Sequence, residues 1–451
     1  MSQTMDGLPI TQRRWAVIAQ SLVVIMAVLD GSIANIALPN IAHSLAVTPA
    51  ESIWVVNGYQ LAVMVSLIPF AALGDIYGYR RVYAWGIGLF TIASVGCACS
   101  TTMPMLIFAR LAQGFGAAGL MSVNPALMRF IFPRSELGRA IGLTGLVVSL
   151  SGAAGPSIAS GILAISTWPW LFLINIPVGV LALGLTQTLP LTPLAKHRFD
   201  WASALLNAGM FGLGIAAISG VAHGASYGVI AAELAGAVVI GIYFVRRQYR
   251  LLAPMLPVEL FAIPAFSLSV MTSVCAFVAT TMALVSMPFL LQANGASTIE
   301  VGLLITPWPV AACFVAPFAG RLSDRISAGT LCGLGLFLLG AGLALLVLLP
   351  ENPAWWDFMW RAAMCGGGFA LFQAPNNRLL MASTPRERSG AGSGVLSTAR
   401  LLGQTLGAAL VAVMFGLGIG GGVAGGAEWA LAIASCVALT AMGVVLTRLR
   451  D

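Results

Sequence analysis

The chain alternates along its whole length between long apolar blocks and short polar connections. Most blocks are about 20 residues long, the length of a helix that crosses a bilayer core of roughly 30 Å. We expect helix because a backbone in lipid must satisfy its own hydrogen bonds, and the alternating segments of a membrane β-barrel are not visible. The pattern predicts fourteen spans, at residues 15–39, 52–73, 81–101, 104–128, 139–163, 168–188, 203–221, 227–245, 264–290, 300–320, 329–349, 355–380, 390–415 and 428–447.

Composition agrees with an all-α polytopic membrane protein. Hydrophobic residues make up 59% of the chain and charged residues 8%, whereas soluble domains carry about 25% charged residues. The seven cysteines lie in or beside apolar blocks without metal-ligand spacing, so we interpret them as small core residues. Neither a nucleophile–base pair nor a relay among the three histidines is visible, which argues against an enzyme or a metal site.

The basic residues predict the orientation. With fourteen spans, 19 of the 22 Lys and Arg residues fall on one side of the membrane, in connections or at the ends of spans, whereas the other side carries acids such as Glu51 and Glu300. The positive-inside rule then places both termini in the cytoplasm. The net charge of +7 therefore reflects topology, and we expect no binding to nucleic acid. The three remaining arginines lie within predicted spans: Arg110, Arg361 and Arg400.

The chain also repeats itself. Gly74-Asp75 and the basic residues after it correspond to Ser323-Asp324, and Arg110 corresponds to Arg361, at offsets of 249 and 251 residues. Such a repeat predicts two parallel six-helix halves, an arrangement found in transporters with the substrate path between the halves. The predicted parts are a first bundle, two inserted helices and a second bundle, at residues 1–190, 191–250 and 251–451.

Five segments in chain order then carry a family resemblance. They are residues 29–39 (LDGSIANIALP), 71–81 (AALGDIYGYRR), 110–116 (RLAQGFG), 152–156 (GAAGP) and 168–179 (WPWLFLINIPVG). The chain resembles the major facilitator superfamily, and specifically its fourteen-helix drug:proton antiporter branch. Ala71 replaces the usual leading Gly of the second motif. Ala159-Ser160 replaces the glycine pair that usually follows Gly155-Pro156, and this departure bears on the direction of transport, because that motif marks antiport in the family.

The resemblance implies the major facilitator fold of two six-helix bundles, with two linker helices inserted. It also implies proton-driven export by alternating access, without a cofactor. Gly74, Asp75, Gly78, Arg80 and Arg81 would form a tight cytoplasmic loop that acts as a conformational latch. Gly152, Gly155 and Pro156 would let the fifth span pack closely against a neighbouring helix and bend.

Asp30 is the most distinctive candidate residue. It lies about fifteen residues into the first predicted span, where a charge costs roughly 2.5–3.5 kcal/mol. A carboxyl group there can carry a proton in one state and release it in another. The alternative is a structural carboxylate paired with an arginine. The resemblance implies that Arg110 takes part in the proton relay, and because a guanidinium keeps its proton, Arg110 would modulate Asp30.

Candidates for a substrate cavity are aromatic and amide residues of the spans together with one arginine. Aromatic rings could stack on a lipophilic solute and amides could orient it. Trp54 could equally be an interfacial anchor, and Arg400 could meet an anionic substrate or simply be a structurally paired arginine. The residues are Trp54, Tyr59, Gln60, Gln113, Phe372, Gln373, Asn376 and Arg400.

These observations favour a proton-coupled exporter of lipophilic small molecules in a bacterial inner membrane, with a periplasmic adaptor protein as a possible partner. Besides Asp30, the only acid well inside a span is Glu233, in an inserted helix, so we expect neutral, monocationic or anionic substrates. The alternative within transport is a carrier for a specific metabolite or lipid. A sensor or structural protein usually has a soluble output domain, and the longest cytoplasmic stretch, residues 189–202, is too short for one.

Overall fold

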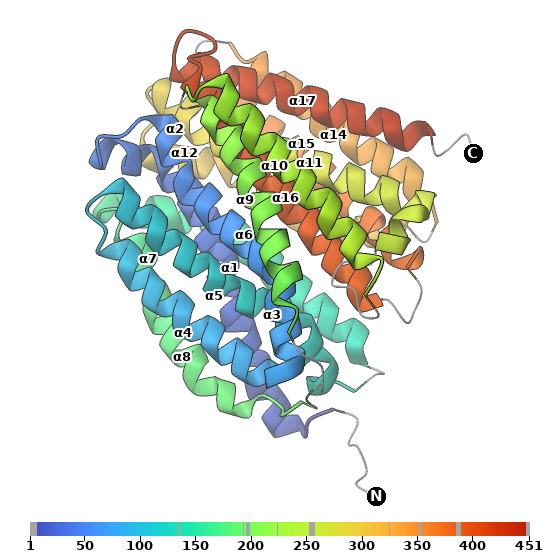
Figure 1. Cartoon of the computed structure of the whole chain (residues 1–451). Coiled ribbons are helices and arrows are strands. Elements are labelled where there is room, and N and C mark those ends of the chain that lie inside the picture. The colour runs from blue at the N-terminus through green and yellow to red at the C-terminus, as the bar shows by residue number, and fades with distance from the viewer. Residues whose placement is uncertain are drawn as a thin grey trace, which may run out of the picture.

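A computed structural model describes residues 7–133, 136–192, 194, 199–222, 224–251, 258–323, 325–350, 354–384 and 389–447. The described residues form helices and no strands (Figure 1), so the all-α prediction is confirmed for them. Asp324 and seven of the basic loop residues lie outside the described residues. These seven are Arg134, Lys196, Arg198, Arg386, Arg388, Arg448 and Arg450.

The helices coincide with the predicted spans. The first half contains α1 (Ile10–Ser44), α2 (Pro49–Ser52), α3 (Trp54–Tyr77), α4 (Tyr79–Ala98), α5 (Met103–Ile131), α6 (Leu137–Ile165), α7 (Trp170–Leu173), α8 (Asn175–Leu185) and the 3₁₀ turn Thr186–Thr188. The inserted pair is α9 (Trp201–Ala222) and α10 (Tyr227–Gln248). The second half contains the 3₁₀ turn Val258–Ala262, α11 (Pro264–Ala293), α12 (Thr298–Ile305), α13 (Pro307–Leu322), α14 (Ala328–Val347), α15 (Trp355–Ala382), α16 (Ser389–Gly416) and α17 (Val423–Thr447).

Twelve segments of the described chain are long and apolar enough to cross a membrane. The fifth and twelfth predicted spans correspond to α6 and α15, which have 29 and 28 residues. Both are long enough to cross a membrane, but α15 carries several polar side chains. The chain is therefore a multi-pass membrane protein, and the count of fourteen stays a prediction.

In three predicted spans the helical hydrogen bonding lapses at one residue. These residues are Ile53 between α2 and α3, Ile174 between α7 and α8, and Thr306 between α12 and α13, and each keeps right-handed helical backbone angles, so the span continues through it. Proline accounts for the last two lapses, because Pro177 and Pro307 lack the N–H that would continue the helical hydrogen bonds. The hydropathy pattern alone does not show these lapses, since the apolar block continues through each of them.

Within each half, glycines allow neighbouring helices to approach closely. Gly86 of α4 faces Gly116 of α5, and Gly335 of α14 faces Gly368 of α15. A Cβ atom added at Gly86 would lie 2.9 Å from the carbonyl oxygen of Gly116. Small residues are the usual means of close helix packing in membranes, where no hydrophobic effect drives helices together.

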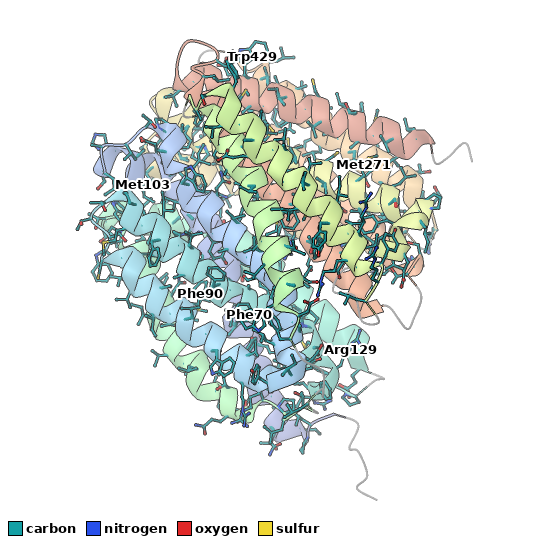
Figure 2. The ribbon with its side chains drawn as sticks, viewed as in Figure 1. Phe70, Phe90, Met103, Arg129, Met271 and Trp429 are labelled. Atoms are coloured by element: carbon teal, nitrogen blue, oxygen red, sulfur yellow. The ribbon has the colours of Figure 1, made fainter. Side chains whose placement is uncertain are left out.

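The two halves share a hydrophobic core at one end of the helices only. Ile36 and Ile41 of α1 belong to the same cluster of buried side chains as Met287 and Leu291 of α11. Figure 1 shows the halves converging near α2 and α12. Met103 and Trp429 lie toward this end and Arg129 toward the other (Figure 2). With the predicted orientation, the shared core is at the outer face of the membrane.

At the opposite end, each half has its own buried clusters. One cluster is built almost entirely from the first half, with Leu401 of α16 as its only buried member from the second. Two smaller clusters, around Phe372 and around Leu380, contain second-half residues alone. The helices α1 and α17 begin and end, respectively, at this divergent end (Figure 1). The halves are therefore closed on one another at the predicted outer end.

The inserted pair lies across the seam between the halves. Its first helix, α9, packs against α10, α3 and α16, and Asn207 donates a hydrogen bond to the carbonyl oxygen of Val65 at 3.0 Å. An ion pair of 3.0 Å joins Asp200 to Arg247 at the end of the pair. Burial would raise the pKa of Asp200, but hydrogen bonds from Ser203 and the charge of Arg247 lower it below its usual value. This carboxylate therefore stays ionised at neutral pH.

The glycine contact between α4 and α5 predicts unequal effects of two substitutions in one helix. Gly86→Ala should destabilise the protein by about 1–3 kcal/mol, because the new methyl group meets backbone atoms of α5 that cannot move aside. Gly88→Ala is the control, since no atom lies within 4 Å of its added Cβ, and helix propensity favours Ala by roughly 1 kcal/mol. Apparent melting temperatures of the purified proteins in detergent measure both effects. Equal melting temperatures for the two variants would contradict the assigned contact.

Candidate functional site

Asp30 lies in the interior of the first half. It occupies the middle of α1, and its residue is 2% exposed. It shares a buried helix face with Met26, Ile33 and Ala37, which follow at helical spacing. A charged group at this place has left water completely and depends on protein partners.

Three side chains donate hydrogen bonds to the Asp30 carboxylate. A terminal nitrogen of Arg110 lies 2.6 Å from Oδ2. The amide nitrogens of Gln113 and Asn175 lie 2.9 Å and 3.0 Å from Oδ1. The donors come from α5 and α8, so the carboxylate joins three helices. The Asp30 carboxylate therefore accepts from three donors, one of which is the positively charged guanidinium of Arg110.

Arg110 is as buried as its partner, with 1% exposure. Its Nε donates to the carbonyl oxygen of Val55 at 2.8 Å, and a terminal nitrogen donates to Gln113 at 2.6 Å. The guanidinium lies 4.4 Å from the centre of the Tyr59 ring and 5.5 Å from that of Phe172. These contacts are cation–π interactions, which strengthen where water is excluded. The positive charge of Arg110 is therefore balanced by Asp30, by two further hydrogen-bond acceptors and by two aromatic rings.

Gln113 completes the network. It is fully buried, accepts from Arg110, and donates to both Asp30 and the hydroxyl of Ser94 at 2.9 Å. The hypothesis from the sequence was a substrate contact. The structure instead uses both ends of this amide in the pairing of Asp30, because α5 turns Gln113 toward α1 and α4 and away from the seam.

The other predicted cavity residues do not converge on one place. Phe372 packs inside the second half against Cys332 and Leu336. Asn376 is buried and bonded to Ser269, Ser273 and Thr272 of α11. The sequence shows that these residues lie in spans but does not show which face of the helix they occupy. Both lie inside the second half in this structure.

Five predicted cavity residues lie elsewhere. Trp54 packs beside the core shared by the two halves, and Tyr59 lies under Arg110. The Oε1 atom of Gln60 is buried without a partner among the described residues. Gln373 and Arg400 are half-buried. Of these residues, the structure brings only Tyr59 into direct contact with the Asp30–Arg110 pair.

The expected latch loop has the predicted tight turn. Gly78 has φ +92°, a conformation that favours glycine, and an added Cβ at Gly74 would meet Tyr79. Asp75 accepts a hydrogen bond from the Tyr79 hydroxyl, within the same half. Among the described residues, neither Arg80 nor Arg81 has an ion-pair partner. A contact across the seam is absent from this part of the structure, and a latch role stays a prediction.

The glycine motif of α6 lies where the halves meet. An added Cβ at Gly155 would collide with Ser32 of α1, whereas no atom lies within 4 Å of one at Gly152. Further along α6, Ser160 and the carbonyl oxygen of Pro156 press against Gly302 of α12, in the other half. Close packing is therefore present at Gly155 and at Ser160, and the predicted hinge role stays untested.

Comparison with known proteins identifies the family of the chain. The family model of the Major Facilitator Superfamily matches residues 21–408 and 268–451. The chain belongs to the major facilitator superfamily. It is therefore a membrane transporter for a small-molecule substrate and not an enzyme, and the predicted major facilitator fold is confirmed.

The transporter has informative relatives. It is 54% identical to the uncharacterised transporter YebQ of Escherichia coli K12, over 89% of this chain and 88% of that one. It is 34% identical to the multidrug resistance protein Stp of Mycobacterium tuberculosis, over 86% and 73%. A solved structure of a bacterial homologue of the human lysosomal transporter Spinster has a TM-score of 0.71 and 16% identity, and covers 98% of both chains.

The buried pair predicts a strongly non-additive pair of substitutions. Arg110→Gln should lower the stability of the transporter by about 3–5 kcal/mol, because it leaves the Asp30 carboxylate buried without a cation. Adding Asp30→Asn to this variant removes the uncompensated charge and should restore a large part of the loss. The measurement is the apparent melting temperature of the single and double variants at one pH. Additive losses would show that the two side chains act independently.

Proposed function

We propose that the transporter exports lipophilic small molecules by alternating access, and that protonation of Asp30 drives the cycle. The observation that carries this proposal is the hydrogen bonding of the carboxylate, which accepts from Arg110, Gln113 and Asn175. Resistance functions in the names of relatives such as Stp support export of toxic compounds. The proposed setting is a bacterial inner membrane with both termini in the cytoplasm, and the proton gradient takes the place of a cofactor.

The geometry gives protonation a mechanical consequence. A protonated carboxyl group is itself a donor. A proton on Oδ2 would remove the charge that attracts Arg110, and a proton on Oδ1 would compete with the amides of Gln113 and Asn175. In either case the interaction of Asp30 with Arg110 weakens when Asp30 is protonated. Since the donors belong to α5 and α8, we expect the packing of these helices against α1 to loosen with the proton.

Loss of the titrating group should uncouple transport from the gradient. We expect cells that express Asp30→Asn to lose the resistance that the wild type confers in a screen of lipophilic antibiotics and dyes. With one compound from that screen, wild-type proteoliposomes should accumulate it against its gradient when a pH gradient is imposed. Asp30→Asn should only equilibrate the compound, because an asparagine at position 30 has no titratable group.

Asp357→Asn is the matched control, since Asp357 is also a carboxylate in an arginine ion pair, at 2.9 Å from Arg361. This variant should keep both resistance and gradient-driven accumulation. Full uphill accumulation by Asp30→Asn would exclude Asp30 as the coupling residue. Insensitivity of the wild type to a protonophore would instead point to facilitated transport.

The outer contact between the halves offers a direct test of alternating access. The hydroxyl oxygens of Ser157 in α6 and Thr306 between α12 and α13 lie 2.9 Å apart. A Ser157→Cys/Thr306→Cys pair, in a background without the native cysteines, should form a disulfide and hold the halves together at this end. Transport should stop on oxidation and return on reduction. Each single cysteine variant serves as the control, and undiminished transport by the oxidised pair would show that this contact need not open.

A further inference from the structure

Of the arginines Arg110, Arg361 and Arg400, which lie within spans, Arg400 is the one that has no ionic partner among the described residues. Arg110 pairs with Asp30 at 2.6 Å and Arg361 with Asp357 at 2.9 Å. Arg400 lies about a dozen residues into α16, and within the described part of the chain it has neither an ion pair nor a hydrogen bond. A guanidinium inside a membrane protein is costly unless an acceptor faces it. The Arg400 guanidinium is therefore available to an acceptor that is not among the described residues.

The packing of α16 shows where Arg400 lies. Added Cβ atoms at Gly403 and Gly407 would contact α11, so this face of the helix is turned into the second half. Leu401 is instead buried in the core of the first half. Helical geometry places Arg400 between these two faces, at the seam. It is half-buried, and it lies within electrostatic range of Tyr59 on α3.

Further polar groups without partners accompany it. Gln404 follows one turn later on the same helix face, is half-buried, and makes no hydrogen bond to the described residues. On α3, the helix that carries Tyr59, the Oε1 atom of Gln60 is also buried without a partner among the described residues. Buried polar groups without protein partners mark places that water or a ligand fills.

We propose that Arg400 and Gln404 bind the carboxylate of amphipathic anionic substrates at the seam between the halves. The inference rests on the proposed export function and adds the substrate class. A guanidinium matches a carboxylate with two parallel hydrogen bonds, and an amide can orient the same group. Among the buried acids of the described spans, Asp30 is already committed to Arg110. The repeat puts an apolar stretch near Val148 opposite Arg400 in the first half, so the cation has no symmetric counterpart.

Tyr59 connects this position with the proton site. Its ring covers the guanidinium of Arg110 at 4.4 Å, and its hydroxyl lies within electrostatic range of both Asp30 and Arg400. Tyr59 is therefore within electrostatic range of both the proposed anion site and the carboxylate that takes up the proton. An ionised Asp30 repels a bound anion, and a protonated Asp30 does not. Binding of an acid should thus be tighter in Asp30→Asn than in the wild type, whereas binding of an uncharged ester should not change.

The test compares an acid with its own ester. Dansyl-phenylalanine carries a carboxylate, and dansyl-phenylalanine methyl ester has the same apolar body without the charge. Binding to the purified full-length transporter in detergent is followed by dansyl fluorescence. We expect the wild type to bind the acid roughly tenfold or more tightly than the ester, since hydrogen bonds to charged groups are worth this factor.

Three variants locate the effect. Arg400→Gln should abolish the preference for the acid and keep the ester affinity, which also shows that the variant is folded. Arg400→Lys should keep part of the preference, because the charge remains and the two-pronged geometry is lost. Arg246→Gln is the control with the same loss of charge, because Arg246 is an exposed arginine of α10 with no partner among the described residues. It should behave as the wild type.

Equal wild-type affinity for acid and ester, no binding of the acid, or an unchanged preference in Arg400→Gln would each overturn the inference. If Arg400→Gln fails to fold, the wild type and Arg400→Lys still decide it. Proton-driven export of uncharged compounds by a wild type that does not prefer the acid would leave the proposed function intact. Preference for the acid without any proton-driven transport would refute the proposed function alone.

Discussion

The fold of the first half depends on the need to compensate one negative charge inside a membrane protein. Asp30 and Arg110 are both out of contact with water, and each would be expensive alone. Their compensation fixes the rotation of α1, brings α8 in through Asn175 and ties α4 in through Gln113 and Ser94. Replacing the pair by hydrophobic residues would often be no less stable, so its presence favours a role in the transport cycle.

The sequence was sufficient to predict the helices and to name Asp30 and Arg110 as interacting residues. Apolar blocks of spanning length are long and unambiguous, Asp30 is one of only two acids well inside a predicted span, and the family resemblance points to Arg110 among the three arginines of the spans. The roles of Gln113 and Asn175 could not be predicted, because amides are neutral and their partners depend on helix rotation. The same rotation explains why Phe372 and Asn376 lie inside the second half. A shift of one position turns a helical side chain by about 100°.

The two halves differ in whether a deep arginine has an ionic partner. Arg110 of the first half is paired with Asp30, whereas Arg400 of the second half has no ion pair among the described residues. The halves are joined by apolar contacts at one end and by α9 along the seam. Apolar contacts carry little directional preference, so they can separate and re-form without leaving orphaned polar groups. The polar network around Asp30, in contrast, is confined within one half, so its hydrogen bonds can change with the proton without involving contacts across the seam.

The contact between Ser160 and Gly302 bears on how transporter motifs should be read. Ser160 occupies a place where the family motif usually has glycine. Gly302 on the facing helix leaves the room that the larger serine side chain needs. What the interface constrains is the combined volume of two facing side chains. A substitution in one half can therefore be neutral when its counterpart shrinks, and the two positions are expected to change together during evolution. A sequence motif can therefore depart from the family pattern along one helix while the packing between the two helices is preserved.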